Sequence, residues 1–141
     1  MTTPEAMTDA TTEDLLEHGR RMVEAEPAAD EIGAIWLFFS DSGPCGHGNP
    51  DITAQTGRAF LEKILPGLAS DARAQSCVVA VPERDEPKTL AVIAITPRAI
   101  QAKSLEVKAG DGRTQVIELP GTVAGELLAA ADAVRKALTS T

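Results

Sequence analysis

The run Ile35-Trp36-Leu37-Phe38-Phe39 constrains the fold more than any other feature of the chain. Five consecutive large apolar residues without polar alternation are typical of a strand that is covered on both faces. Ile, Trp and Phe also favour a strand over a turn of buried helix. All three Phe and the single Trp lie between positions 36 and 60, so the heaviest core side chains surround this segment. We therefore expect the fold to be built around this strand.

The residues after this run predict a loop and then a helix. Positions 40–48 read Ser-Asp-Ser-Gly-Pro-Cys-Gly-His-Gly, a composition typical of a loop. Asn49 is a favoured N-cap, Pro50 suits the first helical position, and Asp51 complements the helix dipole. Apolar residues then recur at helical spacing, at Ile52, Phe60, Leu61, Ile64, Leu65 and Leu68. A helix over about 50–65 is predicted.

The remaining elements follow from apolar patterning. A helix with a narrow apolar stripe is predicted over 13–26, ended by Pro27 to Asp30, and strands are predicted over 76–81 and 89–96. The alternating segment 104–119, which turns at 109–112, predicts an exposed hairpin edge, and Thr122 caps a final amphipathic helix. The sequence of strand, helix and strand predicts that 35–39 and 76–81 are parallel and joined by a right-handed crossover. The expected fold is α+β (mixed α/β): a five-stranded, mostly antiparallel sheet in the order α-β-α-β-β-β-β-α, covered by helices.

The domain organisation is expected to be simple. Residues 1–11 are small and polar and predict a disordered tail, and residues 12–141 predict a single domain. Met1 and Met7 are both possible starts.

The charge is concentrated at the N-terminus. Residues 1–31 carry nine acids and two arginines, a net charge of −7, whereas the rest of the chain is close to neutral within a total of −8. An acidic helix would help to steer a basic protein partner, although the simpler interpretation is a solvated face that keeps the protein soluble. No basic stripe is present, which disfavours nucleic-acid binding. No apolar run reaches the length of a membrane span and no secretory signal is visible, so we expect no membrane association and a cytoplasmic location.

The segment between the first strand and the predicted helix is the candidate ligand site. Glycine amides and a helix N-terminus at the end of an interior strand favour an anion or small ligand. The spacing, however, matches neither a dinucleotide fingerprint nor a phosphate loop, and Asp41 and Asp51 would repel phosphate. The candidate ligand-binding residues are Ser40, Ser42, Gly43, Cys45, Gly46, His47, Gly48 and Asn49.

Cys45 and His47 are weak candidates for catalysis by a thiol and its base, because no third, orienting residue can be named. Cys45 and His47 could also bind zinc, with Asp41 or Asp51 adding oxygen ligands. A structural zinc site usually needs four ligands, and for a site of cysteines and histidines His18 and Cys77 would both have to converge on Cys45 and His47. Nothing in the sequence requires that convergence. We therefore predict no metal, no cofactor and no assigned catalytic residue.

The function that these patterns favour is that of a small acidic cytoplasmic binding or interaction protein without its own catalysis. It would be an adaptor, chaperone or inhibitor-like module acting through the acidic N-terminal helix or the hairpin edge. The alternative is a small-ligand sensor or modest enzyme that uses the Ser40–Asp51 loop. A homo-oligomer formed by pairing of exposed hairpin edges is also possible.

Overall fold

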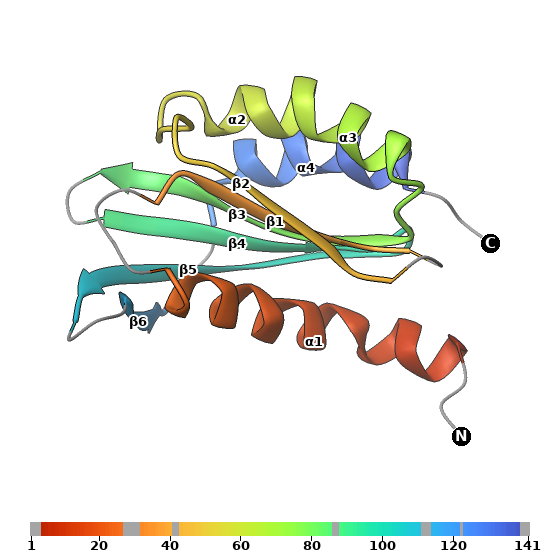
Figure 1. The fold of residues 1–141 in the computed structure, drawn as a ribbon, viewed down its shortest axis with the longest axis horizontal. Coiled ribbons are helices and arrows are strands. Elements are labelled where there is room, and N and C mark those ends of the chain that lie inside the picture. Colours follow the sequence, from red (N-terminus) through yellow and green to blue (C-terminus); the bar gives the residue numbers. More distant parts are fainter. Residues whose placement is uncertain are drawn as a thin grey trace.

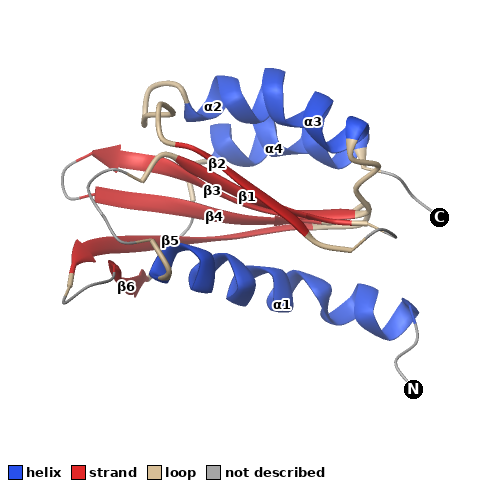
Figure 2. Cartoon of the chain, in the orientation of Figure 1, coloured by secondary structure: helices blue, strands red, loops and turns tan. Residues whose placement is uncertain are grey.

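One antiparallel sheet forms the middle layer of the protein, with helices on both of its faces (Figures 1 and 2). The computed structural model describes residues 4–26, 32–40, 43–85, 88–110, 114–121 and 123–138. Six strands within these ranges pair in the order β2-β1-β3-β4-β5-β6. They are β1 (Ala34–Phe39), β2 (Cys45–Asn49), β3 (Ser76–Asp85), β4 (Lys88–Ile95), β5 (Ile100–Ala109) and β6 (Thr114–Leu119).

Helix α1 (Pro4–Glu24) lies across one face of the sheet (Figure 1). Its narrow apolar stripe, which includes Leu15, Leu16 and Val23, is buried against Val78, Val92 and neighbouring residues of β3, β4 and β5. The apolar stripe predicted from the sequence is therefore buried against the chain's own sheet. Removal of α1 would expose that face of the sheet to water.

The other face is covered by two helices. The first is continuous and consists of α2 (Gly57–Ala59), η2 (Phe60–Ile64) and α3 (Leu65–Asp71); the second is α4 (Gly125–Ala137). In η2 the backbone is π-helical, and the amide of Leu65 donates to the carbonyl of Phe60. Pro66 follows directly. In an α-helix its ring would clash with the carbonyl four positions earlier, and the wider π-helical turn relieves this clash. Both helices pack on Trp36, Phe38 and the apolar residues of β3 and β4.

The predicted α+β class is confirmed, but the sheet has six strands where five were predicted. The additional strand is β2, which occupies residues predicted as a loop. The helix predicted from Asn49 begins at Gly57. The predicted parallel pair is also wrong, because β1 and β3 pair antiparallel. Since β2 reverses the chain, the helical crossover joins β2 to β3, and both of these strands run antiparallel to the β1 strand between them.

The N-terminal helix is longer than predicted. It begins at Pro4, so the backbone of residues 4–11 is helical where a disordered tail was predicted. The expected helix stop at Pro27–Asp30, the turn residues 111 and 112, and the Thr122 cap lie outside the described residues. No helix in the described ranges is both long enough and apolar enough to span a membrane.

Candidate functional site: the outer edge of strand β2

Strand β2 forms one margin of the sheet. It pairs with β1 in a register that sets Trp36 opposite His47 and Phe38 opposite Cys45. No strand in the described part of the chain pairs with its other side. Four of its five residues are exposed. The backbone of its outer edge is therefore open to a further strand.

This strand forms although its sequence, Cys-Gly-His-Gly-Asn, has low strand propensity. The apolar β1 provides a rigid template on its inner side, and Gly33 lets the end of β2 approach closely. A Cβ on Gly33 would lie 2.2 Å from the carbonyl oxygen of Asn49 and 2.7 Å from the backbone of Pro50. Tertiary pairing therefore overrides the local preference for a loop.

Cys45 and His47 project from the same face of β2, because side chains alternate along a strand. Cys45 Sγ lies 3.2 Å from His47 Nε2, and both residues are exposed. Residues paired across two strands share a face, so both side chains lie on the face that carries Trp36, Phe38 and the α2–η2–α3 helix. The predicted candidate pair is thus in contact, at the rim of the sheet.

A short aromatic stack supports this rim. The His47 ring centroid lies 6.2 Å from that of Trp36, which in turn lies 5.0 Å from Phe60 at the start of η2. The indole Nε1 of Trp36 is buried without a hydrogen-bond partner within the described residues. His47 therefore rests on a rigid part of the core, which restricts its position.

Two exposed apolar side chains lie on the helix above this rim. Ile64 is 51% exposed and Leu68 is 36% exposed. Arg58 pairs with Glu126 and so marks the side of this helix that faces α4, whereas Phe60 marks the side that faces Trp36 and β2. Ile64 and Leu68 are four residues apart and share one side of this helix, which differs from the side of the buried Phe60 because the turn between Phe60 and Leu65 is π-helical. The sequence pattern grouped both residues with the buried Phe60, Leu61 and Leu65 in one helical apolar pattern, and their exposure differs from the burial of those residues.

Two of the other predicted ligand-binding side chains, those of Ser40 and Asn49, make local hydrogen bonds in turns. Ser40 Oγ donates a hydrogen bond to the carbonyl of Gly43. Gly43 has a φ of 102°, and it lies between β1 and β2. Ser42 lies outside the described residues. The side chain of Asn49 accepts from the amide of Asp51 at 3.0 Å and so closes a turn. The nearest helix begins at Gly57, so the helix N-terminus on which the anion site depended is not at this position.

The chain's second cysteine and second histidine do not join Cys45 and His47. Cys77 is fully buried in β3, and desolvation raises the pKa of its thiol well above the ordinary range. His18 lies on α1, and its ring contacts Phe39 on the opposite face of the sheet. In the described ranges no group of three or more His, Cys, Asp or Glu side chains is arranged to hold a metal ion. Asp41, a further possible ligand, lies outside those ranges.

The acidic N-terminal helix carries internal ion pairs. Arg20 contacts Glu17 at 2.6 Å and Glu24 at 3.3 Å, and Arg21 contacts Glu17 at 3.4 Å. The Arg20 hydrogen bond lowers the pKa of the Glu17 carboxyl. Glu13 and Asp14 of the same helix are exposed. A basic partner at this surface stays a prediction.

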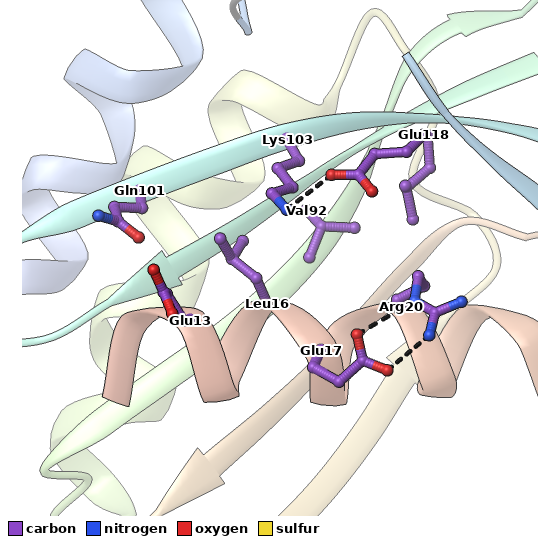
Figure 3. Close-up of a pocket in the computed structure, with 9 residues that line it drawn as sticks. Glu13, Leu16, Glu17, Arg20, Val92, Gln101, Lys103 and Glu118 are labelled. Atoms are coloured by element: carbon purple, nitrogen blue, oxygen red, sulfur yellow. Dashed lines mark hydrogen bonds and ion pairs between the residues drawn. The ribbon is translucent and has the colours of Figure 1, made fainter. Parts of the chain in front are cut away.

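A cavity of about 350 Å³ lies between α1 and the strands β4, β5 and β6 (Figure 3). Its floor is apolar and its rim is charged. The lining residues are Glu13, Leu16, Glu17, Arg20, Val92, Gln101, Lys103, Leu105 and Glu118. Lys103 already pairs with Glu118 at 2.6 Å, and Arg20 pairs with Glu17. A charged ligand would have to displace these pairs, so the geometry does not favour the cavity as a binding site.

Comparison with known proteins leaves the site to be interpreted from its own geometry. No family model, curated protein or solved structure matches this chain.

Proposed function

We propose that this protein is a non-catalytic interaction module that binds a partner protein by adding one of the partner's strands to the outer edge of β2. The observation that carries the proposal is the exposed outer edge of β2, with which no strand in the described residues pairs. Strand addition provides main-chain hydrogen bonds for affinity and places alternate side chains of the added strand against neighbouring pockets.

The edge of β2 suits strand addition better than the edge of β6. Residues 43–50 include no charged side chain, and the glycines at 46 and 48 leave the α1 face of the strand without bulk. At β6, the amide and hydroxyl of Thr114 both donate to the carbonyl of Glu26, and Glu118 adds a charge. Charged side chains are a common protection of sheet edges against pairing. The hairpin edge predicted as the interaction surface is thus the more protected of the two.

A catalytic role for Cys45 and His47 is not part of this proposal. The two atoms are close enough for proton transfer, but both side chains are exposed at the rim rather than enclosed. Chemistry of this kind usually needs an oriented base and a site that excludes water.

The test is selection of binding peptides from a random displayed library, followed by titration with a blocked edge. Gly48→Lys places its Cβ 3.5 Å from the Ala34 carbonyl, an ordinary contact, and puts a long charged side chain at the edge. Gly125→Lys adds the same charge at α4, where nothing lies within 4 Å of the new Cβ. We expect selected peptides to bind the Gly48→Lys variant at least about tenfold more weakly, a loss of roughly 1.4 kcal/mol. We expect the Gly125→Lys variant to bind them as the unmodified chain does.

Equal binding by both variants, or a failure to select any peptide, would contradict strand addition at β2.

A further inference from the structure

We propose that the partner at this edge is a second copy of the chain, and that Cys45 and His47 of both copies together bind one Zn²⁺ ion. The inference rests on the proposed function, because it names the partner of the same edge.

The Cys45–His47 pair has the geometry of half a zinc site. Zn²⁺ binds thiolate sulfur at about 2.3 Å and imidazole nitrogen at about 2.0–2.1 Å, which places two tetrahedral ligand atoms about 3.6 Å apart. Cys45 Sγ and His47 Nε2 are 3.2 Å apart, and exposed side chains rotate through the small remaining difference. The aromatic stack under His47 holds the imidazole at the rim. One ion would therefore be chelated by both residues.

In the described part of one chain no third His, Cys, Asp or Glu side chain is placed to bind an ion together with Cys45 and His47. Cys77 is buried in β3, and His18 lies on the other face of the sheet. A structural zinc ion takes four ligands, so two positions remain open to residues from outside.

A two-fold axis through β2 supplies the missing ligands. If two copies of β2 pair antiparallel with Gly46 opposite Gly46, Cys45 of one copy lies directly opposite His47 of the other, on the same face. Both cysteines and both histidines then gather within the reach of one ion. If the two-fold axis passed through His47 instead of Gly46, Cys45 of one copy would lie opposite Asn49 of the other. The two cysteines would then be four residues apart along the pair of strands. The arrangement is isologous and closed, as a symmetric dimer requires.

The surroundings of this axis favour self-association. The stretch 43–50 is uncharged, so no like charges meet across it although each chain carries a net charge of −8. The charge also balances at the metal: two Cys45 thiols release two protons to solvent, and two thiolates with two neutral imidazoles neutralise one Zn²⁺.

The experiment is sedimentation of the full chain, without purification-tag histidines, in excess Zn²⁺ and in EDTA. We expect a mass of 14.8 kDa in EDTA and twice that mass with zinc, with one zinc retained per two chains. Cys45→Ser, His47→Gln and Gly48→Lys should each remain at the monomer mass with zinc. His18→Gln is the matched control and should dimerise normally. Thermal unfolding in EDTA establishes that each variant is folded, which is expected because the substituted side chains are exposed.

Three results would overturn the proposal in distinguishable ways. An unchanged mass with zinc would exclude the shared site, while the peptide selection would still decide whether β2 binds strands. Zinc-dependent doubling that persists in Cys45→Ser and His47→Gln would place the metal elsewhere. A dimer that resists EDTA but is lost in Gly48→Lys would leave the edge as the interface and remove the metal from it.

Discussion

Replacement of Gly19 by alanine is expected to destabilise the fold, although alanine is the better helix former. A Cβ on Gly19 would lie 2.5 Å from Val92 Cγ1 and 2.8 Å from Val78 Cγ2. Both neighbours are β-branched valines on adjacent inner strands, and such side chains have few alternative rotamers. Overpacking of this kind costs about 1–3 kcal/mol, and we place Gly19→Ala at the upper end because both contacts are far below van der Waals separation. The helix-propensity gain of about 1 kcal/mol leaves a net loss of roughly 2 kcal/mol.

Gly67→Ala is the matched control. Gly67 lies in α3 with nothing within 4 Å of a new Cβ, so the same substitution should stabilise the protein by about 0.5–1 kcal/mol. Urea unfolding of both variants measures the two free energies of unfolding. Adding Val92→Ala to Gly19→Ala should recover part of the loss, since the closest clash is with Val92 Cγ1. If Gly19→Ala raised the stability as much as Gly67→Ala, α1 would not lie against β3 and β4 as described.

Three further predictions concern the core and the β1–β2 pair. In the native protein a thiol reagent should modify Cys45 alone, because burial keeps the Cys77 thiol protonated and inaccessible. Mass spectrometry should find Cys77 labelled only after unfolding, and rapid labelling of both cysteines in the native protein would contradict this burial. Thr89→Val should raise the free energy of unfolding in urea by about 1 kcal/mol, because the Thr89 hydroxyl is buried without a hydrogen-bond partner in the described residues; a decrease would indicate that the hydroxyl has a partner. Gly33→Ala should destabilise the protein and increase amide exchange in β2, since its Cβ would meet the Asn49 carbonyl; unchanged exchange would mean that β2 does not approach β1 this closely.

The strands β3 and β4 and the β5–β6 hairpin were predictable from local sequence. The inner strands are continuous apolar runs, and every residue from Thr89 to Ile95 is buried. Segment 104–119 alternates and forms the predicted antiparallel hairpin, with Val107 opposite Val116 and Ala109 opposite Thr114, so that the turn begins one residue later than predicted. In these elements the side-chain pattern and the tertiary environment favour the same structure.

Strand β2 was not predictable in the same way. A segment with two glycines and no β-branched residue has no strand pattern of its own, and it becomes a strand only because β1 offers an open ladder beside it. The omission of this one reversal also produced the wrong parallel pairing of β1 and β3. Asn49 has the chemistry of a helix cap, and its side chain does accept a nearby amide, but the turn that it closes does not continue into a helix.

The candidate site was predictable only in part. An i, i+2 pair such as Cys45 and His47 shares one face of any extended segment, so their contact follows once the segment is known to be a strand. The position of that strand at the margin of the sheet depends on strand order, which the sequence pattern did not contain. The exposure of Ile64 and Leu68 likewise depends on how the helix above β2 is rotated, and η2 and Pro66 alter that rotation.

Amide hydrogen exchange, measured on the full chain with and without Zn²⁺, tests most directly whether β2 is the edge at which a second strand is added. Protection should increase within Cys45–Asn49 when zinc is present and stay unchanged within Thr114–Leu119, because only the first edge gains a partner. Protection that increased at Thr114–Leu119 instead would contradict β2 as the interaction surface, and protection that increased at neither edge would contradict the zinc-bridged dimer.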